Sequence, residues 1–209
     1  MEDLSPAEFM RDCAGGRAGH ERLLRRVCEV FETRLRHSAQ RIVRDPHAAL
    51  DVVQDTLLKV WHSCAKLRGE ASLATWMTTI LRRTAFDHLD RLHPGQPLEN
   101  AAGELDPAVD EALRRWAGTS PLDAEQWVSS KEGQQLFQAC LERLRSDEPK
   151  VAAVIALLAH EQTSTAELSL ALGKTAGATR QYVSYCRARA RAYFDPWLAW
   201  VHNQPETTP

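Results

Sequence analysis

One segment in the first half of the chain restricts the fold more than any other. Residues 74–91 read ATWMTTILRRTAFDHLDR, and their apolar side chains recur every three to four positions, which is the period of an amphipathic helix. This stripe comprises Met77, Ile80, Leu81, Thr84, His88 and Leu89. No segment of the chain shows the sustained two-residue alternation of a half-buried strand. We therefore expect an all-α protein.

The other side of this helix suggests a role. Arg82, Arg83, Asp87 and Arg91 lie off the apolar stripe, and Trp76 lies near its start. A large aromatic beside arginines offers a stacking face and phosphate-seeking charge, as proteins that hold single-stranded nucleic acid require. A core helix with a solvated basic side has the same pattern, so this segment alone leaves both interpretations open.

Two more helices are expected before it. Residues 20–44 carry apolar side chains on one broad face, and Asp45-Pro46 ends that helix and begins the next, with Asp45 as N-cap and Pro46 in the first turn. We expect the helix from about Pro46 to Cys64 to bury Leu50, Val53, Leu57 and Trp61.

The middle of the chain differs in composition. Residues 92–140 carry eight acidic and three basic side chains, and glycine and proline interrupt residues 92–121, which indicates a connector. Ser129 and Glu132 have capping-box spacing, so a helix is expected from Ser130 to about Arg145. We predict an N-terminal domain over 1–92, a linker over 93–128, a second domain over 129–195 and a tail over 196–209.

Three helices are expected in the second domain. The first covers residues 147–160, the second begins after Ser164 and ends at Gly173, and the third covers Ala176 to about Phe194, with Thr175 as its cap. A short helix, a three-residue turn with glycine and a longer helix are typical of a helix-turn-helix.

The last of these helices has the positive charge that is typical of a DNA-binding helix. Residues 174–191 hold five basic side chains and no acidic one: Lys174, Arg180, Arg187, Arg189 and Arg191. Its expected buried stripe is Thr179, Val183, Cys186 and Ala190, which leaves outward Gly177, Ala178, Gln181, Ser184 and Ala188. Small residues permit close approach to the major groove, glutamine can bond a base edge, and arginines bind phosphates. An ordinary helical hairpin with a basic end remains the alternative.

The helix over 46–64 has a polar outer face with one leucine. Its members are Asp51, Gln54, Asp55, Leu58, Lys59 and His62. Such a face is usually solvated, but it can also dock on a partner helix with Leu58 as the apolar anchor.

Composition excludes several classes of protein. The five cysteines are scattered without a C-x-x-C pair, which argues against a disulfide framework or zinc ribbon. Cys13, His20 and Cys28 match no known ligand spacing, so we expect incidental thiols and neither metal nor cofactor. The chain has no membrane-length apolar run, signal peptide or catalytic motif. We expect a cytoplasmic protein that is not an enzyme.

Residues 50–91, LDVVQDTLLKVWHSCAKLRGEASLATWMTTILRRTAFDHLDR, resemble the central signature of bacterial RNA polymerase sigma factors of the extracytoplasmic-function type. The resemblance rests on the Asp51–Asp55 run, the RGEAS connector over 68–72 and the Thr75-Trp76-Met77 start of a helix that carries Arg82, Asp87, Leu89 and Arg91. The helix-turn-helix falls where this family has its second conserved domain. The resemblance covers about residues 20–92 and 141–193.

The resemblance implies roles for particular residues. The face that docks on the polymerase clamp helices corresponds to Asp51, Gln54, Asp55, Leu58 and its neighbour Lys59. The loop that captures a flipped base of the minus-ten element corresponds to Lys66–Leu73, with Lys66 and Arg68. The helix that holds the opened strand carries Trp76, Arg82, Arg83 and Arg91. The helix that reads the minus-thirty-five element carries Lys174, Thr175, Gly177, Ala178, Arg180, Gln181, Ser184 and Arg187.

The expected function is that of an alternative sigma factor, with core RNA polymerase, promoter DNA and an anti-sigma protein as partners. Two alternatives stay open. One is a helix-turn-helix regulator that binds duplex DNA without polymerase. The other is a protein-interaction module whose C-terminal domain does not read DNA, because Tyr182 and Tyr185 stand where this family has basic groups.

Overall fold

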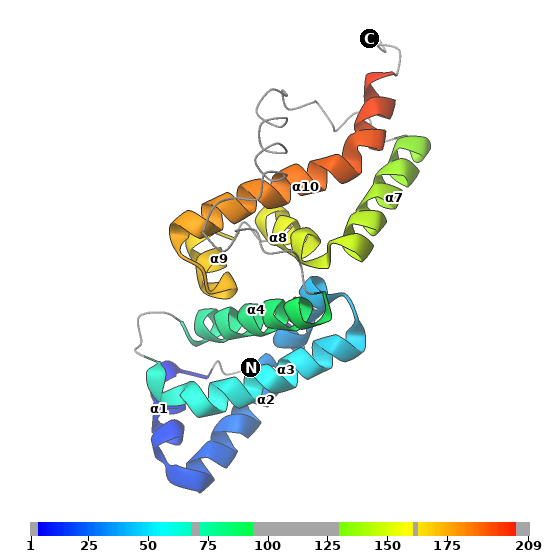
Figure 1. Cartoon of the computed structure of the whole chain (residues 1–209). Helices are drawn as coiled ribbons and strands as arrows, with labels where there is room; N and C mark the ends of the chain where they lie inside the picture. The colour runs from blue at the N-terminus through cyan, green and yellow to red at the C-terminus, as the bar shows by residue number, and fades with distance from the viewer. Residues whose placement is uncertain (1–3, 68–71, 94–129, 161–162, 204–209) are drawn as a thin grey trace, which may run out of the picture. The chain divides into compact units, whose positions relative to one another are not determined.

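The computed structural model describes residues 4–67, 72–93, 130–160 and 163–203 (Figure 1). These residues form helices and no strand, so the all-α prediction is confirmed. The elements are α1 (Pro6–Ala14), α2 (Gly16–Val43), α3 (Pro46–Ser63), the 3₁₀ turn η1 (Cys64–Lys66), α4 (Leu73–Leu92), α7 (Lys131–Asp147), α8 (Pro149–His160), α9 (Thr165–Leu172) and α10 (Ala176–His202). From residue 94 onwards, the predicted linker lies outside the described residues.

The described helices divide into two compact units. One contains α1 to α4 and α9, and the other contains α7, α8 and α10. The domain boundaries expected from the sequence stay a prediction. No helix within the described ranges has the length and apolar character needed to span a membrane.

Local signals set the first helix boundaries. Arg44 ends α2 in the left-handed conformation, with φ 64°, and the Asp45 carboxylate then accepts the Ala48 N–H at 2.7 Å. Ser72 likewise caps α4 by accepting the Thr75 N–H at 3.1 Å. These side chains satisfy N–H groups that a helix start leaves unpaired. The predicted start of α3 at Asp45-Pro46 is confirmed.

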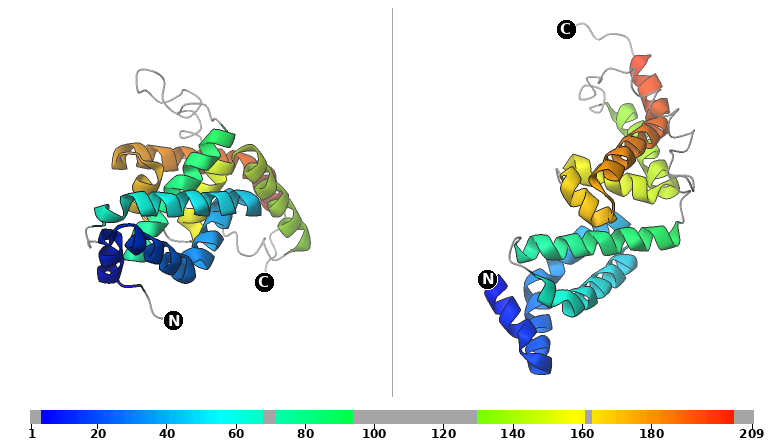
Figure 2. Two further views of the ribbon diagram at one scale, coloured as in Figure 1. Left: turned by 90° about the horizontal axis from the view of Figure 1, so that it is seen from below. Right: turned by 60° about the vertical axis from the view of Figure 1, so that its left-hand side comes forward.

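The core of the first unit lies where α2, α3 and α4 pack together (Figures 1 and 2). On α4 the predicted stripe is buried at Met77, Leu81, Thr84 and Leu89, whereas Ile80 and His88 are half-buried. On α3 the expectation for Leu50 is wrong. Leu50 is 42 % exposed, and the positions that fill the core are Ala49, Val52, Val53, Thr56 and Val60. The apolar face of α3 is therefore rotated by one position at its start.

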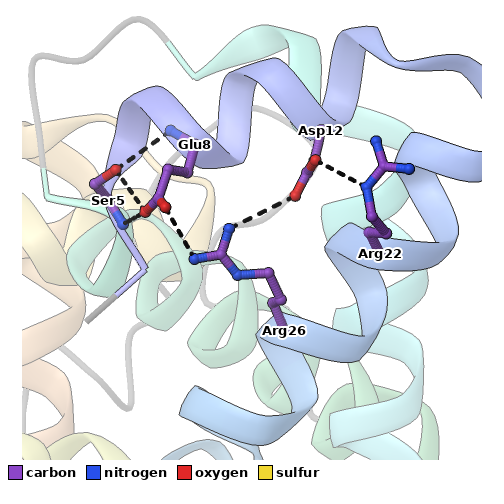
Figure 3. Close-up of polar contacts among 5 residues, drawn as sticks. All are labelled: Ser5, Glu8, Asp12, Arg22 and Arg26. Atoms are coloured by element: carbon purple, nitrogen blue, oxygen red, sulfur yellow. Dashed lines mark hydrogen bonds and ion pairs between the residues drawn. The ribbon is translucent and has the colours of Figure 1, made fainter. Parts of the chain in front are cut away.

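Helix α1 was not expected from the sequence. Ser5 caps it by accepting the Glu8 N–H at 3.3 Å, and the Glu8 carboxylate accepts the Ser5 N–H at 3.1 Å. Phe9 is fully buried. Towards α2, Glu8 pairs with Arg26 at 3.2 Å and the buried Asp12 pairs with Arg22 at 3.4 Å (Figure 3). The helix is thus held by its apolar and its charged side.

The second unit corrects two expected boundaries. Helix α7 is capped by Ser130, which accepts the Gly133 N–H at 3.0 Å, rather than by Ser129. Helix α10 does not stop near Phe194 but continues through Pro196 to His202. It changes direction towards its C-terminal end (Figures 1 and 2), as expected for a helix with an internal proline.

Burial explains why α10 continues. Trp197 and Val201 are 5 % and 4 % exposed and form a cluster with Cys140 of α7. The Trp197 ring lies edge-on to Phe137, with centroids 5.5 Å apart. Removing an indole from water contributes enough free energy to offset the roughly 3 kcal/mol that proline costs inside a helix.

Candidate functional site

The exposed face of α3 carries two large apolar side chains. Leu58 is 57 % exposed and Leu50 is 42 % exposed. Gln54 lies between them at four-residue spacing, so the three share one helix face, and Asp51 and Gln54 are also exposed. The predicted outward position of Leu58 is confirmed, while Leu50 was missed as a member of this face. We call Leu50, Asp51, Gln54 and Leu58 the α3 face.

Of the other three residues expected on this face, His62 is exposed, and the remaining two contact α4 instead. The Asp55 carboxylate pairs with Arg91 at 3.9 Å, and the Lys59 ammonium pairs with Asp87 at 3.5 Å. Lys59 also donates to the Thr84 hydroxyl at 3.0 Å. These four charged side chains are about half-exposed or more, and exposed pairs are worth only about 0–1 kcal/mol each. A charged partner could therefore replace either of these contacts.

On α4, the aromatic residue and the arginines have different surroundings. Trp76 is half-buried, and its ring lies edge-on to that of Phe9, with centroids 5.7 Å apart. Arg83 is exposed and Arg82 is half-buried. In the preceding segment Lys66 is exposed, and Arg68 lies outside the described residues. Trp76 consequently has a structural contact besides any role on the surface.

The turn between α9 and α10 has the expected local geometry. Gly173 has φ 64°, a left-handed conformation that favours glycine at the end of a helix. Lys174 and Thr175 follow it and are exposed. Helix α10 then begins at Ala176 as expected. The helix, turn and helix succession predicted from the sequence is confirmed.

The first turns of α10 separate a buried stripe from an exposed one. Thr179, Val183, Cys186 and Ala190 are buried as expected. Exposed side chains are Arg180, Gln181 and Arg187, together with Gly177, and half-buried ones are Ala178 and Ser184. Ala188 is 5 % exposed, so its expected outward position is wrong. Gln181 and its flanking arginines remain available to a ligand.

Two residues on α10 have structural contacts. Arg189 pairs with Glu148, and this hydrogen-bonded carboxylate raises the pKa of the guanidinium. Tyr182 is 6 % exposed, and its ring stacks on that of Tyr185, with centroids 6.1 Å apart. The absence of a basic group at Tyr182 therefore reflects packing, and it removes no positive charge from the exposed stripe.

The cysteines depart from the expectation of incidental thiols. Cys13 and Cys64 form a disulfide between α1 and η1, with Cα atoms 6.0 Å apart. Among the described residues, His20 joins these two cysteines in a group whose potential ligand atoms lie within 4.8 Å of one another. Cys28, which we considered with Cys13 and His20 from the sequence, does not belong to this group. The two cysteines are 51 residues apart in the sequence, so no local sequence pattern predicts that they pair.

Comparison with known proteins supports the resemblance of residues 50–91. The family model Sigma-70 region 2 matches residues 21–93. The probable RNA polymerase sigma factor RfaY of Xanthomonas campestris pv. campestris is 28% identical over 174 residues, covering 83% of this chain and 41% of the relative. The ECF RNA polymerase sigma factor SigG of Mycobacterium tuberculosis is 28% identical over 175 residues, covering 77% of this chain and 46% of the relative.

Residues 21–93 are thus similar to Sigma-70 region 2, and most of the chain is similar to curated sigma factors. The chain spans less than half the length of the curated relatives that it matches. The region 2 match begins within α2 and ends just after α4. It includes the α3 face, Trp76 and Arg83, whereas α1 precedes it and α10 follows it.

Proposed function

We propose that this protein is a sigma factor that binds core RNA polymerase and directs it to a set of promoters, where it initiates transcription. The observation that carries the proposal is the α3 face. Two leucines that are 57 % and 42 % exposed flank an exposed glutamine and aspartate, inside the residues that match Sigma-70 region 2. Exposed apolar anchors surrounded by polar groups are typical of a docking surface.

The start of α4 supports a role in opening the promoter. Opening requires bases to leave the stack, at a cost of a few kcal/mol each. Arginine contacts to phosphates and stacking on an indole can offset this cost. Arg83 is exposed and Trp76 keeps part of its ring accessible. We assign to Arg83 a phosphate contact with the opened strand, and to Trp76 a stacking contact.

Helix α10 supports recognition of duplex DNA upstream of the opened region. Gln181 is exposed between Arg180 and Arg187. Glutamine can bond an adenine edge in the major groove, and the arginines can hold the backbone. A regulator that acts without polymerase would use the same helix, but it would leave the α3 face without a partner. An inhibitory anti-sigma protein stays a prediction.

In vitro transcription tests the proposal directly. Purified core polymerase is incubated with genomic promoter fragments, with and without this protein, and transcripts are mapped. We expect specific transcripts only when the protein is present. Arg83→Ala should reduce open-complex formation several-fold while core binding is unchanged, and Arg36→Ala, at an exposed arginine of α2, serves as the control. DNA binding without core binding or stimulation would favour the regulator instead.

A further inference from the structure

The disulfide between Cys13 and Cys64 joins two elements beside Trp76. Cys13 lies near the end of α1, and Cys64 begins η1. Their Cα atoms are 6.0 Å apart, in the usual range for a disulfide. From the same α1, Phe9 packs on the Trp76 ring. The state of the two sulfur atoms therefore bears on how firmly α1 covers Trp76.

His20 completes the site. Its Nε2–H donates to the Cys13 carbonyl oxygen at 2.7 Å. The ring also lies edge-on to Trp61, with centroids 5.2 Å apart. These contacts fix an imidazole that has one ring nitrogen within 4.8 Å of both sulfur atoms. An imidazole at that distance can take up a thiol proton through one water and favour the thiolate, which is the reactive form of cysteine.

The remaining cysteines have no such surroundings. Burial and the nearby carboxylates of Glu32 and Glu29 raise the pKa of the Cys28 thiol. Burial raises the pKa of Cys186 to about 12. Cys140 is 6 % exposed within the apolar cluster of α7 and α10. Protonated thiols are poor nucleophiles, so Cys28 and Cys186 serve as internal controls. Within the pair, Cys64 is 4 % exposed and Cys13 is half-buried, so Cys13 is the thiol that a soluble oxidant reaches first.

We propose that Cys13 and Cys64 form a reversible oxidation site. When a small disulfide oxidises the two thiols, the Cys13–Cys64 bond holds α1 against Trp76. Where glutathione and thioredoxin keep thiols reduced, a protein disulfide is transient and is formed by such oxidants. In the reduced state, α1 is held by Phe9 and by the ion pairs of Glu8 and Asp12 with α2 (Figure 3). The Glu8–Arg26 pair is partly exposed, so its contribution to docking is small. The Asp12 side chain is only 11 % exposed, so its pairs with Arg22 and Arg26 keep α1 near α2 without the disulfide, and the disulfide adds a covalent link to them.

The chemistry is thiol–disulfide exchange in two steps. One cysteine thiolate attacks oxidised glutathione, which forms a mixed disulfide and releases one glutathione thiolate. The second cysteine thiolate attacks the protein sulfur of that mixed disulfide, which closes Cys13–Cys64 and releases the second glutathione. Two electrons pass from the cysteines to the oxidant, and the two thiol protons end on the two glutathione molecules. His20 holds the first of these protons in transit.

The full chain is reduced, freed of reductant and titrated with oxidised glutathione, and its thiols are then alkylated and identified by mass spectrometry. We expect Cys13 and Cys64 to pair first, while Cys28, Cys140 and Cys186 stay alkylatable. Cys28→Ser should behave as wild type. His20→Gln keeps a donor for the Cys13 carbonyl but cannot accept the proton, and it should slow closure by at least about tenfold.

Hydrogen exchange of residues 6–14 gives the second measurement. On oxidation, exchange should slow by at least about thirtyfold, the lower end of the stabilisation that a disulfide typically confers, and reductant should reverse this change. Cys13→Ser should abolish this slowing of exchange on oxidation, whereas Cys28→Ser should retain it. The proposal is overturned if Cys28 oxidises as fast as the pair, if no intramolecular bond forms, or if the reduced protein binds one Zn²⁺ that blocks oxidation. Neither measurement uses polymerase, so failure here is distinct from failure of the proposed function.

Discussion

Truncating the leucines of the α3 face should weaken binding to core polymerase by a calculable amount. Full burial of a leucine side chain is worth about 1.5–3 kcal/mol. Leu58 is 57 % exposed and Leu50 is 42 % exposed, so covering them contributes at most about 1–2 and about 0.6–1.3 kcal/mol respectively. Leu58→Ala should therefore raise Kd by up to about five- to twentyfold, and the double variant by up to about a hundredfold.

The assay is an equilibrium titration of the labelled protein with purified core polymerase at one fixed ionic strength. The chain offers two matched controls in Leu92 at the end of α4 and Leu170 on α9, which are 59 % and 61 % exposed. Alanine at either control position should leave Kd within about twofold of wild type, because isolated surface substitutions change free energies by about 0.5 kcal/mol or less. Thermal unfolding of each variant checks that the fold is intact.

One pattern of results would refute this reasoning. If Leu58→Ala and Leu50→Ala bind core polymerase as wild type does, the α3 face is an ordinary solvated surface. Equal loss at Leu92 would likewise remove the distinction between this face and any other exposed leucine. A loss accompanied by lower thermal stability would assign the effect to folding instead, which the exposure of these side chains makes an unexpected result.

Two further predictions concern stability and titration. Trp197→Ala should lower the free energy of unfolding by about 3–5 kcal/mol in denaturant titrations, and Trp200→Ala, at a half-buried position, should cost less. For Glu8, hydrogen bonds from the Ser5 side chain and backbone, and then Arg26, lower the pKa from 4.5 to about 2. The stabilisation from Glu8 is thus present above pH 4.5 and is lost as pH falls through about 2. An NMR titration in which Ser5→Ala leaves the Glu8 pKa unchanged would contradict that assignment.

Local chemistry explains which helix boundaries could be predicted. Asp45-Pro46 and Gly173 act through their own backbone and nearest neighbours, and both appear as expected. Ser5 and Glu8 carry the same kind of signal in Ser-Pro-Ala-Glu, so α1 was within reach of sequence reasoning. Pro196 also looked like a local stop, but burial of Trp197 against a helix more than fifty residues earlier outweighs it.

Parts of the candidate site depend on packing that no local pattern records. Leu58 and Gln54 could be placed on the outer face of α3 because they recur at helical spacing with the polar residues of that helix. Leu50 fits both the buried and the exposed period of α3, and only the docking of α2 and α4 decides its position. The Cys13–Cys64 pair depends on where α1 lies, so its two members could not be matched from spacing.

If the protein binds polymerase and promoter DNA as proposed, the ion pair between Asp55 and Arg91 would couple the two binding events. Arg91 cannot hold Asp55 and a DNA phosphate at full strength together, so a polymerase cation that pairs with Asp55 would make Arg91 a better phosphate ligand. Linkage would make this effect mutual, and a pair worth about 0–1 kcal/mol would limit it to roughly fivefold. Such a coupling would favour binding to polymerase before binding to the promoter, and it would lower occupancy of DNA by the unbound protein.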